Sequence, residues 1–226
     1  MVDSSGETKY LAVIGDIRGS RLAPRRAELQ KLMERALEEI NREFADEVVA
    51  GFVITLGDEF QGLLRKPGKA VKVLVALEAL LGETSVRYGL GWGTISTELR
   101  ELAFGMDGPC FHRGREAVGE SKRVDRWVTV SGFGGDDEVL NGLLWLVGAA
   151  RGRWTSVQRE TVEQVRAART QREVAAARGV HESSVSQALK AALHEPVLAA
   201  ERSVEIILRR YSNLHPDGEA GMEVTK

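Results

Sequence analysis

Hydrophobic positions divide the chain into a strand-and-helix part followed by an all-helical part. The uninterrupted apolar run Tyr10–Ile14 is typical of a strand that is covered on both faces. Over 24–44 the apolar residues instead recur every three or four positions, which predicts an amphipathic helix. Strands are expected at 48–55 and 60–64, joined by the tight hairpin turn Leu56–Glu59.

The same alternation of strand and helix patterns continues to about residue 150. It predicts helices at 70–81 and 109–119, and strands at 86–95 and 127–130. The order strand, helix, hairpin, helix, strand implies an α+β fold in which helices cover a mixed sheet.

Beyond Trp154 the chain shows only helical patterns. Thr155 with Gln158, and Thr170 with Glu173, each spell a capping box, which predicts helices that start near 156 and 171. We therefore expect a first domain at 1–150, a helical domain at 151–211 and a mobile tail at 212–226.

Residues 170–190 have the layout of a helix-turn-helix. Val174 and Val185 are apolar positions suited to packing between two helices, and Gly179 permits a left-handed turn between them. The layout resembles the DNA-binding helix-turn-helix of many bacterial regulators. It predicts a small all-α domain whose partner is double-stranded DNA.

The second helix of this segment is expected to enter a major groove. Gln187 can bond adenine with both ends of its amide, and the serines can bond either bases or phosphates. The residues expected to meet DNA are Arg172, Glu182, Ser183, Ser184, Ser186, Gln187 and Lys190, with Arg169 and Arg178 also placed for the DNA backbone. A helical hairpin used for protein contact or dimerisation is the alternative interpretation.

Composition and charge narrow the function classes. The chain has 226 residues, 43% hydrophobic and 28% charged, which fits one larger or two small globular domains and argues against a fibrous or disordered protein. Its net charge of −2 excludes a polycation that coats nucleic acid. The 11 basic and 7 acidic residues of 151–215 give that part a charge of +4, so any contact with DNA is expected to be local to it.

Cysteine and targeting signals point to the cytoplasm. Cys110 is the single cysteine and the histidines are scattered, which excludes an intramolecular disulfide and a Cys/His zinc cluster. The apolar run 139–150 is too short to cross a bilayer, and the N-terminal segment does not have the pattern of a secretion signal. We therefore expect a cytoplasmic protein that does not bind membranes.

Three carboxylates stand at turns that follow strands. Asp16 follows the first strand, while Asp58 and Glu59 form the tip of the hairpin. If the first strand lies beside the hairpin, these carboxylates converge, and like charges at short range require a cation between them. Carboxylate oxygens suit Mg²⁺ or Mn²⁺, and Mg²⁺ commonly also binds substrate phosphates. The pattern therefore predicts a metal site for a nucleoside triphosphate or a related nucleotide.

The loop after the first strand fits that ligand. Gly19 lets the backbone approach closely, Ser20 can donate to a phosphate oxygen, and Arg21 or Arg25 adds positive charge. Asp and Gly are also ordinary turn residues, so turn chemistry alone remains an alternative explanation of these positions.

Three motifs carry a family resemblance: 13–20 (VIGDIRGS), 55–60 (TLGDEF) and 87–93 (RYGLGWG). They resemble the motif series of class III nucleotidyl cyclases, and the hairpin resembles the GGDEF turn of diguanylate cyclases, with Leu56 in place of the first glycine. The whole layout down to about residue 211 resembles the bacterial SatD family. The resemblance implies a ferredoxin-like, cyclase-like palm domain in which Asp16, the Ile17 carbonyl and Asp58 bind metal.

The chain departs from the cyclase pattern on a later helix. Cyclases carry there an asparagine and, four residues on, an arginine that stabilises the transition state, whereas this chain has His112 and Glu116. Arg113 and Arg115 are near but out of register. Because phosphoryl transfer depends on such a positive charge, the sequence favours nucleotide binding over turnover. The remaining residues expected to bind nucleotide are Gly57, Asp107, Arg113 and Arg115.

Together these patterns favour a regulator that binds a nucleotide with Mg²⁺ in its first domain and DNA in its second. Two alternatives stay open. One is an active nucleotidyl cyclase or nucleotidyltransferase that uses two metal ions, and the other is a scaffold with a degenerate pocket and a protein-binding helical domain. A homodimer is compatible with all three.

Overall fold

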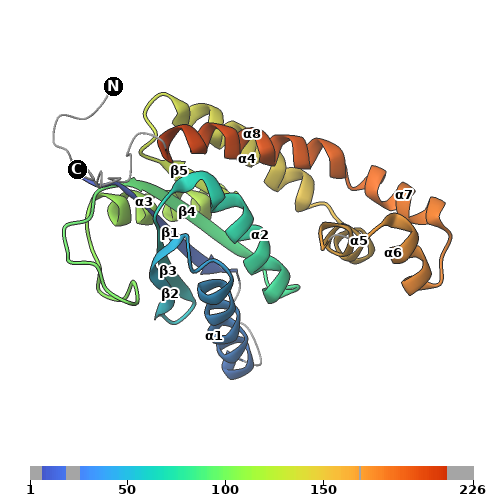
Figure 1. Ribbon diagram of the computed structural model, residues 1–226, viewed down its shortest axis with the longest axis horizontal. Helices are drawn as coiled ribbons and strands as arrows, with labels where there is room; N and C mark the ends of the chain where they lie inside the picture. Colours follow the sequence, from blue (N-terminus) through green and yellow to red (C-terminus); the bar gives the residue numbers. More distant parts are fainter. Residues whose placement is uncertain (1–6, 19–25, 168, 213–226) are drawn as a thin grey trace, which may run out of the picture.

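The computed structural model describes residues 7–18, 26–167 and 169–212 and shows a sheet-containing body from which a smaller group of helices projects (Figure 1). The strands are β1 (Tyr10–Ile17), β2 (Val48–Leu56), β3 (Glu59–Leu64), β4 (Val86–Gly93) and β5 (Val128–Ser131). The helices are α1 (Arg26–Glu43), the 3₁₀ turn η2 (Pro67–Lys69), α2 (Ala70–Leu81), α3 (Pro109–Arg123), α4 (Asp136–Arg151), α5 (Ser156–Arg166), α6 (Gln171–Arg178), α7 (Glu182–Ala191) and α8 (His194–Ser212).

The five strands form one mixed sheet in the order β2-β3-β1-β4-β5. Strand β1 lies at its centre and runs antiparallel to both β3 and β4, while β5 is parallel to β4. The first four strands, with α1 and α2 between them, have the ferredoxin-like order of elements. The α+β fold with a mixed sheet is therefore confirmed, and the hairpin does lie beside the first strand.

One face of the sheet is covered closely by α3. The residues of β4 that point toward this helix include Gly89 and Gly91. A Cβ atom at Gly91 would lie 2.0 Å from the Cys110 carbonyl oxygen, and one at Gly89 would lie 2.2 Å from the Gly114 carbonyl oxygen. The helix can lie at this distance only because β4 has no side chains there.

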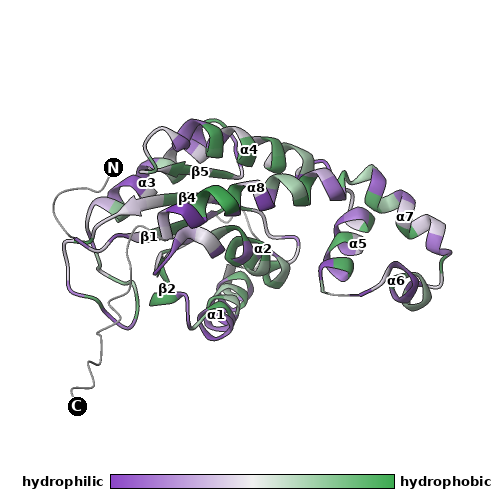
Figure 2. Cartoon of the chain, turned by 45° about the horizontal axis from the view of Figure 1, so that its top comes forward, coloured by the Kyte–Doolittle hydropathy of each residue, from purple (hydrophilic) through white to green (hydrophobic). Residues whose placement is uncertain are grey.

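The other face carries the main hydrophobic core, which α1, α2, α4 and α8 complete (Figure 2). Helix α1 contributes Met33, Leu37 and Ile40, whose side chains are buried. Leu32 is one of the apolar residues of the periodic run 24–44, but it is 37% exposed, so the buried face of α1 lies on the side of Met33.

Helices α5, α6 and α7 project from the body as a unit, here called the arm (Figure 1). The arm has its own apolar cluster, formed by Val162, Val174, Ala175, Val185, Leu189 and Ala192. Helix α8 then returns to the body, where Val204 and Leu208 join the main core. The Tyr211 hydroxyl donates to the Phe133 carbonyl oxygen at 2.5 Å and closes this contact.

Most predicted elements are confirmed, with shifts at their ends. Helix α3 extends four residues past its expected end, strand β4 ends two residues early, and the run 139–150 forms most of α4, which the pattern did not assign. The predicted tail beyond Ser212 and the predicted helix start at Pro24 lie outside the described residues. In the described part of the chain, each helix is too short or too polar to span a bilayer.

Candidate functional site

The end of β1 meets the tip of the β2–β3 hairpin. Asp16 lies directly opposite Glu59 in the antiparallel register of β1 and β3. The next residue, Ile17, donates its backbone N–H to the Asp58 carbonyl oxygen at 3.1 Å. Gly57, with a φ of 63°, makes the turn that places Asp58 there. The structure therefore brings the two predicted acidic turns together at one edge of the sheet.

A lysine from α3 neutralises these carboxylates. The Lys122 Nζ lies 2.8 Å from Asp16 Oδ1 and 3.8 Å from Glu59 Oε2. The Asp16 side chain is only 13% exposed, so a cation next to it compensates for lost hydration. Among the described residues, no three side chains of His, Cys, Asp or Glu gather in a group that could hold a metal ion.

Two arginines lie near this end of the sheet, Arg87 at the start of β4 and Arg18 directly after β1. Arg87 lies opposite Asp16 in the β1–β4 register. Its Nη2 is 2.8 Å from Asp125 Oδ1, and the Nη2 of Arg18 is 3.1 Å from the same oxygen. The hydrogen bond from Arg87 lowers the pKa of Asp125, and burial lowers the pKa of Arg18. This end of the sheet thus carries two groups of ion pairs, Lys122 with Asp16 and Glu59, and Asp125 with Arg18 and Arg87.

The sequence patterns alone do not single out the lysine and the two arginines of these ion pairs. Arg87 begins the motif 87–93, which offered a signal for it. Arg18 lies inside the first motif. Lys122 carried no signal, because its position depends on how α3 packs against the sheet.

The other predicted nucleotide-binding residues lie at the opposite end of α3. Asp107 accepts a hydrogen bond from Arg115 Nη1 at 3.0 Å and contacts His112 Nε2 at 3.1 Å. The bond from Arg115 is the main cause that lowers the pKa of Asp107 to about 2. Arg113 donates to the Trp92 carbonyl oxygen at 2.7 Å.

Helix length separates this second group from the carboxylates. Arg113 and Lys122 are nine residues apart on α3, which corresponds to about 14 Å along the helix. Within one chain the structure therefore does not bring Asp107, Arg113 and Arg115 to the Asp16 edge. Gly19, Ser20, Arg21 and Arg25 lie outside the described residues.

The arm contains the predicted pair of helices. Both capping boxes are present, at Thr155 and Thr170, and Gly179 ends α6 in the left-handed conformation with a φ of 63°. Val185 and Leu189 are buried against the rest of the arm. The predicted DNA-contacting side chains of α7 are all exposed: Glu182, Ser183, Ser184, Ser186, Gln187 and Lys190.

The arginines of α6 differ in their surroundings. Arg172 is exposed. Arg178 is partly buried and its Nη1 donates a hydrogen bond to the Thr161 hydroxyl, so it holds α6 on α5. His181 occupies the N-cap of α7 without a capping side-chain bond.

Comparisons with known proteins identify one family. The SatD family profile matches residues 10–202. Among curated proteins, none matches this chain. Two solved structures of a bacterial light-regulated adenylyl cyclase are similar, with TM-scores of 0.39 and 0.40 and sequence identities of 10% and 14%. Each similarity covers 55% of this chain, but 43% of the first cyclase chain and 76% of the second.

Proposed function

This chain belongs to the SatD family, and we propose that it is a DNA-binding regulatory protein that contacts double-stranded DNA with helix α7. The observation that carries the proposal is the arm itself, in which α6, a three-residue turn and α7 pack on α5 and leave one polar face of α7 outside. Helix-turn-helix proteins present a helix to the major groove in this way.

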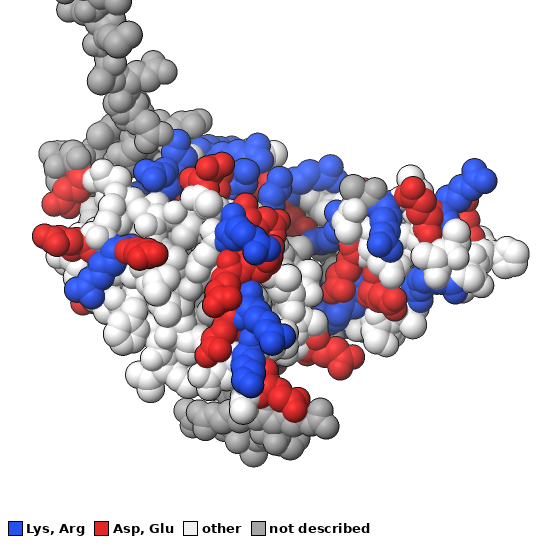
Figure 3. Space-filling model, turned by 60° about the horizontal axis from the view of Figure 1, so that its bottom comes forward, with Lys and Arg blue, Asp and Glu red and all other residues white. Residues whose placement is uncertain are grey.

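The outer face of α7 has the chemistry of a base-reading surface. Gln187 offers a donor and an acceptor side by side, Ser183 and Ser186 offer short hydroxyls, and Lys190 supplies one charge. Arg172 at the start of α6 adds a second charge for the phosphates. Over the face drawn in Figure 3, acidic and basic side chains are interspersed, so affinity for DNA has to come from these local contacts.

Salt dependence with matched variants tests the proposal. Fluorescence anisotropy with mixed-sequence duplexes should show binding that weakens as salt rises, and Lys190→Ala should reduce the slope of log affinity against log salt by about 1. Gln187→Ala should weaken the preference for particular base sequences that appears when duplexes are selected from a random pool. Arg210→Ala, an exposed arginine on α8 outside the arm, is the control.

Two results would reject DNA binding. One is the lack of affinity for any duplex at low salt. The other is an equal effect of Lys190→Ala, Gln187→Ala and the Arg210→Ala control.

A second candidate function is nucleotide binding with Mg²⁺ at the Asp16 edge. Asp16, Asp58 or Glu59 and the Ile17 carbonyl would hold the ion, and the ion would supply positive charge to a polyphosphate. Their oxygen chemistry suits Mg²⁺, and a cation, the Lys122 ammonium, already lies against two of the carboxylates. A metal ion and Lys122 would therefore compete for the same oxygens.

That competition gives a direct test. Lys122→Met keeps the length of the side chain and removes its charge, so the variant should bind Mn²⁺ more tightly than the unaltered chain does in calorimetric titration. Asp16→Asn should abolish the gain. Unchanged or weaker Mn²⁺ binding by Lys122→Met would exclude this site. The enzyme alternative is decided by pyrophosphate release from each triphosphate with Mg²⁺, which we expect to be undetectable.

A further inference from the structure

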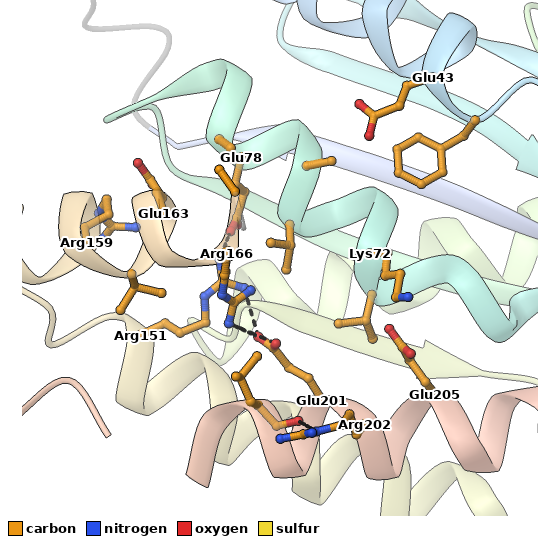
Figure 4. Close-up of a pocket in the computed structure, with 18 of the residues that line it drawn as sticks. Glu43, Lys72, Glu78, Arg151, Arg159, Glu163, Arg166, Glu201, Arg202 and Glu205 are labelled. Carbon is orange, nitrogen blue, oxygen red and sulfur yellow. Dashed lines mark hydrogen bonds and ion pairs between the residues drawn. The ribbon is translucent and has the colours of Figure 1, made fainter. Parts of the chain in front are cut away.

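A large cavity lies at the joint between the arm and the body. Its volume is about 860 Å³, within the range of small-molecule sites. Figure 4 shows that side chains from α2, α5 and α8 point toward this one space. Neither the DNA-contacting face of α7 nor the carboxylates at Asp16 line it.

Much of the cavity wall is apolar. It includes residues of the body and of the arm: Val71, Val75, Ala79, Val162, Leu198 and Ile206. Burial raises the pKa of Glu163 and of Glu205, which line the same space, as expected for carboxylates beside an apolar wall. The space therefore suits the carbon skeleton of a ligand.

Arg151 is a buried residue of the cavity wall. Its side chain is 9% exposed, lies over the ring of Trp127 at 4.3 Å and is paired with Glu78. One of its terminal nitrogens, Nη1, has no hydrogen-bond partner and is 3.9 Å from the nearest oxygen of Glu201. Two carboxylates lie near Arg151, but a buried N–H donor that lines a cavity and makes no hydrogen bond is the kind of group that an oxygen of an anionic ligand satisfies.

A second cavity of about 370 Å³ adjoins the first and shares Glu78, Arg151 and Arg159 with it. Five arginines and three acidic residues line this smaller cavity. One of them, Arg126, lies 4.3 Å above the ring of Trp145. A cavity with much apolar wall therefore adjoins one that is lined by more arginines than acidic residues.

We propose that the joint binds an amphipathic organic anion, with its apolar body between α2, α5 and α8 and its single acidic group at Arg151 and Arg159. The chemical class follows from the two cavities: a ring or chain of carbon that ends in a carboxylate, sulfonate or phosphate. This site does not rest on DNA binding by α7, because none of the residues of the two proposals is shared.

The probe for the test is 1-anilinonaphthalene-8-sulfonate, which has aromatic rings and one anionic group. Titration of the full chain should give a single saturable fluorescence transition. Ala79→Trp places an indole in the cavity from an exposed position on α2 and should weaken the affinity about tenfold or more. Ala199→Trp is the matched control, since Ala199 is exposed on α8 outside the cavity.

The charge requirement is tested separately. Arg159→Gln should weaken binding of the sulfonate probe by about tenfold, the loss expected for one charge-assisted contact. The same variant should leave the affinity of the neutral analogue N-phenyl-1-naphthylamine unchanged.

Circular dichroism confirms that each variant is folded. Unsaturable or undetectable binding, or equal effects of Ala79→Trp and Ala199→Trp, would overturn the site. Equal loss of both probes in Arg159→Gln would overturn the assignment of an anionic ligand.

Discussion

At the scale of single residues, Lys122 decides what the strand-end carboxylates can do. The meeting of Asp16 with the hairpin could be predicted, because an apolar strand and a tight turn fix their positions in the sheet. The contact between Lys122 and Asp16 could not be predicted, because α3 continues four residues past the end that its sequence suggested and only then reaches Asp16. Ion pairs between distant elements depend on helix length and rotation, which hydrophobic spacing does not specify.

The Tyr211 hydroxyl makes the stability of the folded protein depend on pH in a way that can be measured. Burial, together with a hydrogen bond to Asp136, raises its pKa from 10.0 to about 12. Its folded-state pKa lies above the unfolded value, so its contribution to stability is complete below pH 10 and is lost as the pH rises toward 12.

We therefore expect Tyr211→Phe to lower the free energy of unfolding by about 1 kcal/mol at pH 8. The difference from the unaltered chain should narrow between pH 10 and 12, as urea titrations at each pH would show. The buried Tyr88 is present in both proteins and cancels in the comparison. A difference that widens with pH would contradict this account.

At the scale of elements, local signals predicted where two helices start, whereas the hydropathy pattern missed a third helix. The capping boxes at Thr155 and Thr170 placed α5 and α6 correctly, since the cap bonds are made within four residues. Helix α4 was missed because Trp145 and Leu146 are apolar and yet exposed, so hydropathy does not alternate along it.

The contact between β4 and α3 supports a prediction at this scale. Gly91→Ala would place a methyl group 2.0 Å from the Cys110 carbonyl oxygen and force the helix off the sheet, at a cost of about 3 kcal/mol or more. Gly119→Ala, in the same helix but with nothing within 4 Å, should instead stabilise by about 0.5–1 kcal/mol. Urea unfolding measures both, and similar effects of the two substitutions would refute the close approach.

At the scale of the whole molecule, a buried ion network joins the arm to the body. Glu201 of α8 accepts two hydrogen bonds from Arg166 of α5, at 3.0 and 2.9 Å, and is 7% exposed. Arg151 lies between Glu201 and Glu78 of α2. These partners are 35 to 73 positions apart in the sequence. The hydrophobic pattern could therefore indicate the arm and the body, but not the ion pairs that hold them together.

Removing the Glu201 carboxylate should destabilise this contact between the arm and the body. Glu201→Ala leaves the buried Arg151 and the partly buried Arg166 without their shared carboxylate and should lower the free energy of unfolding by about 3–5 kcal/mol. Glu195→Ala removes an acid of the same helix that is 80% exposed and should change it by less than about 0.5 kcal/mol. Thermal unfolding of the two variants compares them, and equal midpoints would show that the network is not stabilising.

Because α8 returns to the core, a break in the backbone between α6 and α7 should leave both parts of the chain bound to each other. Residues before the arm and residues after it contribute to the same apolar core, with α8 packed along α4 (Figure 1). A protease that cuts the backbone between α6 and α7 would therefore release no fragment, because each half is retained by the other. Two polypeptides that are synthesised separately and divided at that turn should therefore assemble into one complex.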